Sequence, residues 1–162
     1  MEVYLIRHAD AFPLGEGGST DDASRPLTSG GEQQATNSAA GLKRRGIRPG
    51  IVLSSPLVRA RQTAERMVDA LGEPMVDVRI CEDLAPGGKR RKLARVLKDL
   101  GLDSAALVGH QPDLGILASW LIGSKKAEIE MAKAGVACVH FEEGPGRPKG
   151  CLVWLVTPQW LS

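Results

Sequence analysis

Two histidines and two arginines stand close behind short apolar runs of the sequence, at 3–6, 51–53 and 105–108. Arg7 and His8 follow the first run, Arg59 lies soon after the second, and His110 follows the third. A guanidinium stays charged at cellular pH, whereas an imidazole with a pKa of about 6.5 can be neutral. Two groups of each kind suit a tetrahedral dianion such as phosphate. A neutral imidazole could also attack phosphorus, and this chemistry calls for no metal or cofactor.

The order of strands and helices explains how these side chains would meet. Between residues 3 and 122, short apolar runs alternate with longer segments whose apolar residues recur at helical spacing. This alternation predicts an α/β fold with a mainly parallel sheet and helices on both faces. Apolar segments at 135–142 and 151–157 predict a C-terminal antiparallel hairpin. Because right-handed crossovers bring the carboxyl ends of parallel strands to one edge, the four side chains and two helix N-termini should converge there.

Capping residues predict where the first two helices begin. Ser29 and Glu32 have the spacing of a capping box, and Thr28 is an alternative N-cap for a helix that runs to about Arg45. The Ser-Ser-Pro segment 54–56 predicts the start of the second helix, with its proline in the first helical position. Arg59 would then lie in the first turns of that helix.

The remaining boundaries come from shorter signals. Alternating apolar and charged residues over 75–80 predict a strand toward an edge of the sheet. A third helix, striped by leucines and valine over 93–100, should end at Gly101. A fourth helix should begin near Pro112.

Two polar segments have more than one interpretation. Residues 12–25 are rich in glycine and contain Asp21 and Asp22, which predicts a mobile loop beside the site or a plain connection. The five basic residues between 89 and 95 crowd the start of the third helix, where the helix dipole does not favour cations. A solvated face and a contact for an acidic partner explain this run equally well.

Composition limits the class of protein. A chain of 162 residues with 43% apolar and 25% charged residues is expected to form one domain, residues 1–162. A net charge of +2 predicts no nucleic-acid or membrane surface. The first residues lack a basic leader, and no apolar run approaches the roughly 20 residues of a spanning helix, so we expect a cytoplasmic protein.

The cysteines and the third histidine are expected to take no part in the chemistry. Cys81, Cys138 and Cys151 lack the spacing of a metal or redox site, and we interpret them as buried free thiols. His140 lies within a strand of the expected hairpin, without polar neighbours, which favours a structural role.

The segments around the four candidate residues resemble the motifs of the histidine phosphatase superfamily, which includes phosphoglycerate mutases and acid phosphatases. The family's R-H-G/A signature is matched by Arg7-His8-Ala9, and other matches follow in the expected order over most of the chain. These matches are Arg25-Pro26-Leu27-Thr28 with the downstream Gly31, the segment 54–64, and Val108-Gly109-His110-Gln111-Pro112. The short length, the R-P-L-T segment and the E-D-L-A-P-G-G segment look most like the small bacterial phosphohistidine phosphatases of the SixA type.

The resemblance implies a phosphoglycerate mutase-like fold and a set of roles. His8 would be the phosphorylated nucleophile, and Arg7, Arg59 and His110 would form the phosphate pocket. Larger members of the superfamily also place a carboxylic acid near the site as proton donor. Here the corresponding region offers only Glu82 and Asp83, in a pattern unlike the usual E-x-x-x-G-x-x-E-G.

Asp83 aligns better than Glu82 with the acidic residue of the small branch. A carboxylate in a turn is commonly just a turn former, however, which is the competing interpretation of Asp83. Asp10 is a further, weaker candidate for the acid.

The leading hypothesis is a phosphatase that works through a phosphohistidine at His8. Imidazole is a less basic leaving group than an alkoxide and needs little help from an acid, so the missing acid motif favours phosphohistidine-containing proteins as substrates. The basic run 89–95 could steer an acidic partner, an attraction that weakens with salt. Alternatives are a small-molecule phosphomonoesterase, a phosphoglycerate mutase-like enzyme and a non-catalytic phosphate-binding module.

Overall fold

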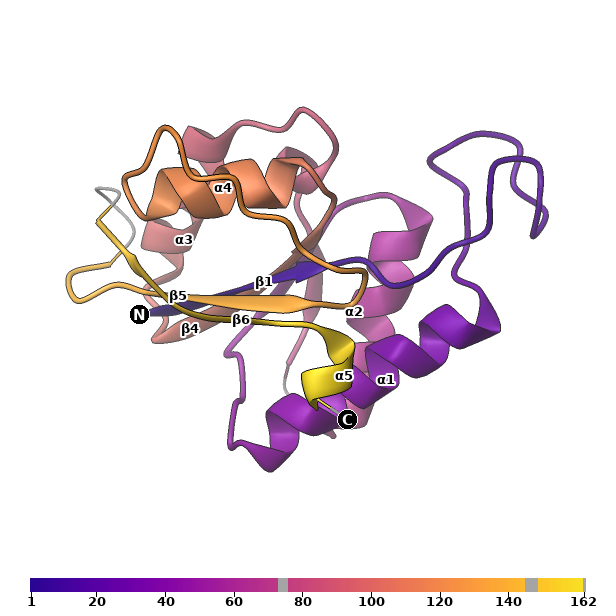
Figure 1. The fold of residues 1–162 in the computed structure, drawn as a ribbon, viewed down its shortest axis with the longest axis horizontal. Coiled ribbons are helices and arrows are strands. Elements are labelled where there is room, and N and C mark those ends of the chain that lie inside the picture. The colour runs from indigo at the N-terminus through magenta and orange to yellow at the C-terminus, as the bar shows by residue number, and fades with distance from the viewer. Residues whose placement is uncertain (73–75, 145–148, 162) are drawn as a thin grey trace.

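A six-stranded sheet forms the centre of the protein, with its strands in the order β3-β2-β4-β1-β5-β6 (Figure 1). The computed structural model describes residues 1–72, 76–144 and 149–161. The strands are β1 (Glu2–Arg7), β2 (Val52–Ser54), β3 (Val78–Ile80), β4 (Ser104–Gly109), β5 (Val136–His140) and β6 (Cys151–Val156). The pairs among β1 to β4 are parallel, whereas β5 is antiparallel to both of its neighbours, β1 and β6. The predicted mainly parallel sheet with a C-terminal hairpin is therefore confirmed.

Helices cover both faces of this sheet, as predicted. In Figure 1, α1, α2 and α5 lie on one side of the strands and α3 and α4 on the other. The helices are α1 (Ser29–Arg44), α2 (Val58–Leu71), α3 (Arg90–Leu100), α4 (Asp113–Leu121) and α5 (Pro158–Leu161), with a short 3₁₀ turn, η1, at Glu82–Leu84. None of the helices in these described ranges is long and apolar enough to cross a bilayer.

The side chains of β1 show why its sequence is continuously apolar. Val3 and Leu5 pack with α3 and α4, whereas Tyr4 and Ile6 pack with α1, α2 and α5. All four are buried, because a central strand between two helical layers has no polar side. β1 thus fixes the position of Arg7 and of the residues that follow it.

The capping residue of α1 is Thr28 and not Ser29. The Thr28 hydroxyl accepts a hydrogen bond from the N–H of Gly31 at 3.0 Å. The Ser29–Glu32 capping box was therefore wrong, and the alternative N-cap is confirmed. Thr28 is held in place because its hydroxyl also donates to the Asp10 carboxylate at 3.0 Å.

The predicted start of α2 was also wrong. Ser54 is the last residue of β2, and α2 begins at Val58 without a side-chain cap. Ser55 does not cap the helix because its hydroxyl lies 2.8 Å from the imidazole Nε2 of His110. A serine that looked like a helix cap thus contacts a candidate site residue.

Two smaller expectations change in the structure. The strand predicted over 75–80 is shorter, since β3 covers only Val78–Ile80, and Met75 lies outside the described residues. Its place at an edge is confirmed. All three cysteines are free, but only Cys138 is buried, while Cys81 is half-buried and Cys151 is exposed. Cys151 is exposed because it opens the edge strand β6, whose side chains alternate between half-buried and exposed.

Gly31 allows the start of α1 to approach the chain just after His8. A Cβ atom at Gly31 would lie 2.0 Å from the carbonyl oxygen of Asp10, whereas one at Gly30 would lie 3.7 Å from its nearest neighbour. We expect Gly31→Ala to lower the free energy of unfolding by about 1–3 kcal/mol, because backbone atoms must move apart. Urea unfolding at an unchanged m-value measures this loss.

Gly30→Ala is the matched control in the same helical turn. It should raise the free energy of unfolding by roughly 0.5–1 kcal/mol, because alanine loses less backbone conformational entropy on folding than glycine and its Cβ would meet no close atom here. Equal stability of the two variants would contradict the close approach at Gly31.

Candidate active site

Neighbouring parallel strands bring His8 and His110 together. In the β1–β4 register Arg7 faces Gly109, and the N–H of His8 donates to the carbonyl of Gly109 at 3.0 Å. The two imidazole centroids are 5.2 Å apart. The predicted convergence of these residues at one edge of the sheet is thus present in the structure.

His8 is held as a neutral imidazole with one free nitrogen. Its Nδ1 lies 2.7 Å from the carbonyl oxygen of Ala9 and therefore donates to it, which leaves the lone pair on Nε2. Burial lowers the pKa of His8 to about 4, and the charges of Arg59, Arg7 and Lys133 act in the same direction. An unprotonated Nε2 is what a nucleophilic histidine requires.

His110 is oriented by Ser55. The Ser55 hydroxyl accepts from the N–H of Leu57 at 3.3 Å and can donate its own proton to His110 Nε2, and we assign the ring proton of His110 to Nδ1. That Nδ1 is buried and has no hydrogen-bond partner among the described residues. The pKa of His110 is lowered to about 3. Burial is the largest cause, and electrostatic interactions with His8 and Arg59 lower the pKa further.

The two arginines each combine a backbone contact with an unused donor. Arg7 Nη1 donates to the carbonyl of Met131 at 2.8 Å, and Arg59 Nη1 donates to that of Asp22 at 2.6 Å. The Nε atoms of both arginines are buried and lack a partner within the described ranges. Together with His110 Nδ1 they are buried polar atoms that a bound anion could satisfy.

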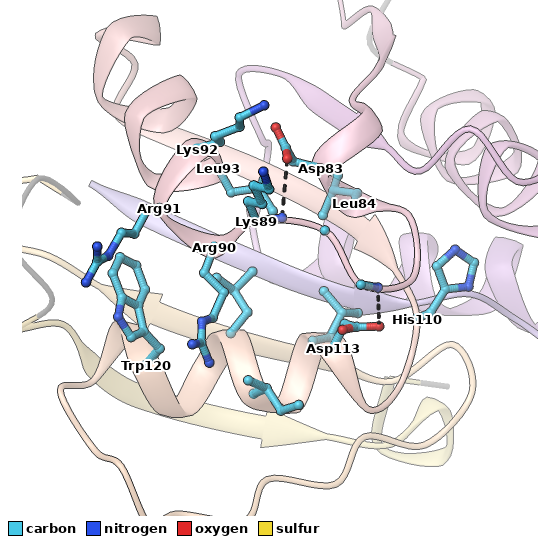
Figure 2. Close-up of a pocket in the computed structure, with 15 residues that line it drawn as sticks. Asp83, Leu84, Lys89, Arg90, Arg91, Lys92, Leu93, His110, Asp113 and Trp120 are labelled. Carbon is cyan, nitrogen blue, oxygen red and sulfur yellow. Dashed lines mark hydrogen bonds between the residues drawn. The ribbon is translucent and has the colours of Figure 1, made fainter.

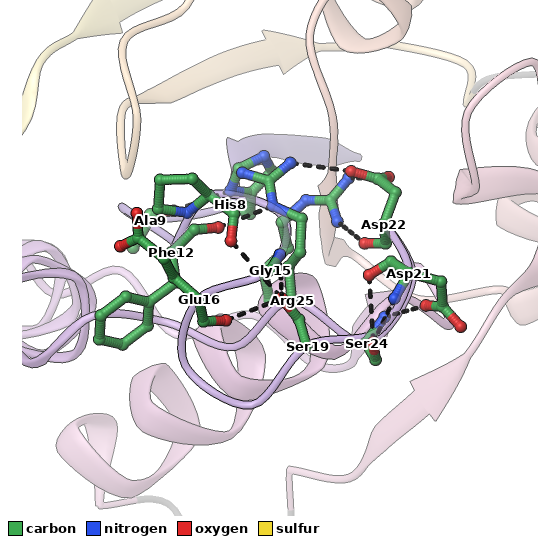
Figure 3. A network of polar contacts seen from close by, with 12 residues as sticks. His8, Ala9, Phe12, Gly15, Glu16, Ser19, Asp21, Asp22, Ser24 and Arg25 are labelled. Carbon is green, nitrogen blue, oxygen red and sulfur yellow. Dashed lines mark hydrogen bonds and ion pairs between the residues drawn. The ribbon is translucent and has the colours of Figure 1, made fainter.

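The loop 12–25 supplies an ion pair that the sequence did not reveal (Figure 3). The Asp22 carboxylate binds Arg25 Nη1 at 2.8 Å and Arg59 Nη2 at 3.0 Å. Arg25 and then Arg59 hold the pKa of Asp22 below its usual range. The three-residue spacing of Asp22 and Arg25, beside a site already expected to hold arginines, was the available signal.

This loop also uses part of the expected anion site. The N–H of Val58, at the start of α2, donates to the carbonyl of Ala23 at 2.9 Å. One of the helix N–H groups that we expected to face an anion therefore has a partner within the protein. The loop is more than a plain connection, because it contacts both Arg59 and the start of α2.

The candidate acids lie in different surroundings. Asp83 lines a cavity of about 580 Å³ together with His110 (Figure 2), and its carboxylate accepts from the N–H of Lys89 at 3.3 Å. Glu82, also in η1, is exposed. Asp10 forms an ion pair with Lys133, and this contact lowers the pKa of Asp10. A carboxylate held in its charged form is a poor proton donor.

The remaining polar residues fall outside this cluster. His140 is exposed and faces Glu2 in the sheet register, at the end of β1 away from His8. Within the described part of the chain, no three His, Cys, Asp or Glu side chains are grouped so that they could hold a metal ion.

Stability should depend on pH through the two buried imidazoles. Their pKa values of about 4 and about 3 lie below the value near 6.5 that they regain on unfolding, so the unfolded chain binds more protons in mildly acidic solution. We expect the stabilising contribution to be complete above about pH 7 and to fall as the pH drops from 6.5 toward 4. The slope should approach about 1.4 kcal/mol per pH unit for each histidine.

Urea unfolding between pH 4.5 and 7.5 tests this dependence. His110→Gln should reduce the slope, because the variant has no imidazole to protonate at this buried position. An unchanged slope in His110→Gln would contradict a neutral buried imidazole at this position.

Known proteins are similar to this chain in sequence and in structure. The family model described as histidine phosphatase superfamily (branch 1) matches residues 3–85. The phosphohistidine phosphatase SixA of Escherichia coli is 29% identical over 161 residues, which cover 98% of this chain and 94% of that one. An uncharacterized protein of Picosynechococcus is 35% identical over an alignment of 172 positions, and this alignment covers 99% of each chain.

A solved structure gives the same relationship in three dimensions. The structure of the protein histidine phosphatase SixA complexed with tungstate has a TM-score of 0.87 and 28% identity, and the match covers 100% of both chains. The sequence motifs, the mixed sheet and these similarities agree with one another. The chain belongs to the histidine phosphatase superfamily and is of the SixA type.

Proposed function

We propose that this protein is a phosphatase that hydrolyses phosphohistidine side chains of other proteins through a phosphoryl intermediate on His8. The observation that carries the proposal is the state of His8. Its Nδ1 donates to Ala9, its pKa is lowered to about 4, and Arg7 and Arg59 are close enough to contribute to that shift. A neutral nucleophile among fixed positive charges suits phosphoryl transfer.

The reaction would proceed in two displacements. In the first, His8 Nε2 forms a bond to phosphorus while the bond between phosphorus and the substrate imidazole breaks. The departing imidazole leaves neutral if its other nitrogen already carries a proton. In the second, a water oxygen forms a bond to phosphorus while the bond between phosphorus and His8 Nε2 breaks and its electron pair returns to Nε2. One water proton is lost to solvent, and inorganic phosphate departs.

Arg7, Arg59 and His110 would stabilise the phosphoryl group during both displacements. The guanidiniums cannot lose their charge, and the buried Nδ1–H of His110 offers a hydrogen bond that needs no reorganisation. The two histidines would thus have different roles, one as nucleophile and the other as donor. Ser55 would support the second role by holding His110 Nε2 at 2.8 Å.

Among the described residues, the candidate acids Asp10 and Asp83 already have partners, which supports phosphohistidine over an ester as substrate. Asp10 forms an ion pair with Lys133, and the Asp83 carboxylate accepts a hydrogen bond from the backbone N–H of Lys89. An alkoxide leaving group would need a proton from such an acid, whereas imidazole departs with little help. The similarity to SixA of Escherichia coli over 94% of that protein favours the same substrate class.

Rapid-quench mass spectrometry under alkaline conditions tests the intermediate. We expect one phosphoryl group on the peptide that contains His8, formed and consumed during turnover of a phosphohistidine protein. A phosphoryl group on His110 instead would overturn the assignment of roles. Phosphate binding without turnover of any phosphorylated substrate would favour a binding module.

A small-molecule phosphomonoesterase is the second candidate, because Asp83 shares a cavity with His110. Specificity constants for a phosphohistidine protein and a small phosphomonoester distinguish the two. A higher constant for the ester, lowered by Asp83→Asn about as much as by His8→Ala, would favour the esterase. Strong isomerisation of 3-phosphoglycerate with bisphosphoglycerate present would point to a mutase instead.

A further inference from the structure

A groove between α3 and α4 begins at His110 and leads away from it. It is the cavity of about 580 Å³ that Asp83 and His110 line, and we call it the α3–α4 groove. Figure 2 shows His110 at one end and Trp120 with Arg91 at the other. A ligand whose phosphoryl group lies beside His110 would therefore extend over this surface.

The α3–α4 groove carries cations that the protein does not neutralise. Lys89, Arg90, Arg91 and Lys92 all line it, and none of them takes part in an ion pair within the described part of the chain. They occupy the N-cap and the first turn of α3. This first turn contains no acidic residue. Because the helix dipole already makes this end positive, such a cluster lowers the stability of the isolated fold.

The carboxylates in the α3–α4 groove do not balance its cations, so the groove has a net positive charge. Asp83 and Asp113 line it, and each accepts a hydrogen bond from a backbone N–H at 3.3 Å, from Lys89 and Gly87 respectively. Two carboxylates face four cations in a chain whose whole net charge is +2. The positive charge is thus local, and it lies beside the candidate site.

The floor and the inner end of the groove also indicate a bound polypeptide. Ile116 is 45% exposed and Trp120, four residues further along α4, is half-buried, and both line the cavity. At the inner end, His110 is only 4% exposed, and its Nδ1 is buried without a partner among the described residues. An occupant with carboxylates, some apolar surface and a phosphoryl group would match all three features.

We propose that the α3–α4 groove binds an acidic segment of the phosphohistidine protein that is the substrate, next to its phosphohistidine. This inference rests on the function proposed above and adds where and how the substrate protein is recognised. Glutamate and aspartate side chains of that segment pair with Arg90 and Arg91, while its apolar side chains cover Ile116 and Trp120. Recognition of this kind raises the specificity constant for acidic carriers and weakens as salt screens the charges.

Two phosphohistidine peptides of equal length test the proposal. One has glutamates on both sides of the histidine and the other has glutamines, and both are phosphorylated with phosphoramidate. The wild-type protein should hydrolyse the glutamate peptide with a kcat/KM about 10-fold higher at low ionic strength, as expected for two or three exposed charge pairs. This preference should shrink at moderate salt.

The double variant Arg90→Glu with Arg91→Glu should lose the preference for the glutamate peptide. Its fold should be retained, because acidic residues at a helix N-terminus are favourable. The matched control is Lys43→Glu with Lys98→Glu, two exposed lysines in the last turns of α1 and α3 with the same change of charge. The control should keep the preference, and both variants should hydrolyse a small phosphomonoester as the wild-type protein does.

Fluorescence anisotropy with the unphosphorylated peptides separates this inference from the proposed function. Binding that favours glutamate, without hydrolysis of either phosphopeptide, would overturn the proposed function and leave the acidic docking surface standing. Hydrolysis of both peptides at equal rates, or a preference that persists in the double variant, would overturn the docking surface alone. Tighter binding of a single-stranded oligonucleotide than of the glutamate peptide would overturn the assignment to a protein partner.

Discussion

Replacement of His8 by alanine is expected to lower kcat/KM for every phosphorylated substrate by roughly 10⁴-fold or more, as for the loss of a covalent nucleophile. We expect that His110 cannot substitute for His8, because its Nε2 is hydrogen-bonded to Ser55 and its Nδ1 is assigned as a hydrogen-bond donor. Release of inorganic phosphate under single-turnover conditions measures the loss. No phosphoryl group should be recovered on the protein after a quench.

The fold of the His8→Ala variant should persist. The His8 side chain makes one described hydrogen bond, to its neighbour Ala9, and removal of a buried imidazole also removes a group that resists protonation. A thermal melt checks this, and His140→Ala, at the far end of the sheet, is the control that should keep wild-type activity. Activity of His8→Ala near that of the control would remove His8 from the mechanism.

The second large effect is expected at Arg59. Arg59→Ala should lower kcat/KM by roughly 10²-fold or more, because a charge-assisted donor to the transferring phosphoryl group is lost from a buried position. Arg59→Lys should be nearly as poor, since a point charge cannot replace a bidentate fork. The Arg59 side chain is only 6% exposed, and both of its Nη atoms donate hydrogen bonds to Asp22.

Arg61→Ala is the control for this comparison. Arg61 lies on the same helix, α2, two residues further on, and it is exposed. It should therefore have little effect on kcat/KM. If Arg59→Lys matched the wild-type protein, Arg59 would add only a diffuse positive field and make no directed contact.

The sheet and the positions of the four candidate residues, Arg7, His8, Arg59 and His110, could be predicted because both depend on local patterns. Continuous apolar runs identify buried parallel strands, and Arg7, His8 and His110 stand directly at their carboxyl ends. Strand spacing then leaves little freedom in where these side chains lie. Arg59 follows the same logic, because β2 leads into α2 within a few residues.

Ser55 and Asp22 could not be assigned because their partners are distant in sequence. Local rules predicted a helix cap for Ser55, yet His110, 55 residues away, is its partner. Asp22 sits in a glycine-rich loop that buries little, and its bond to Arg59 spans 37 residues. When a polar side chain has several possible partners, tertiary contacts decide which of them it binds. The helix or strand that an apolar pattern forms depends instead on residues nearby in the sequence.

The carboxylate of Asp22 has a consequence for how tightly Arg59 would hold the phosphate product in the proposed reaction. As part of the same chain it is present at Arg59 at a high effective concentration, which for a short tether is of the order of millimolar or above. Free inorganic phosphate must compete with this internal anion for the guanidinium. In the proposed mechanism, a phosphoryl group bound covalently to His8 would face no such exchange. The loop would thereby favour departure of the free anion over its retention, which limits product inhibition in a phosphate-rich medium.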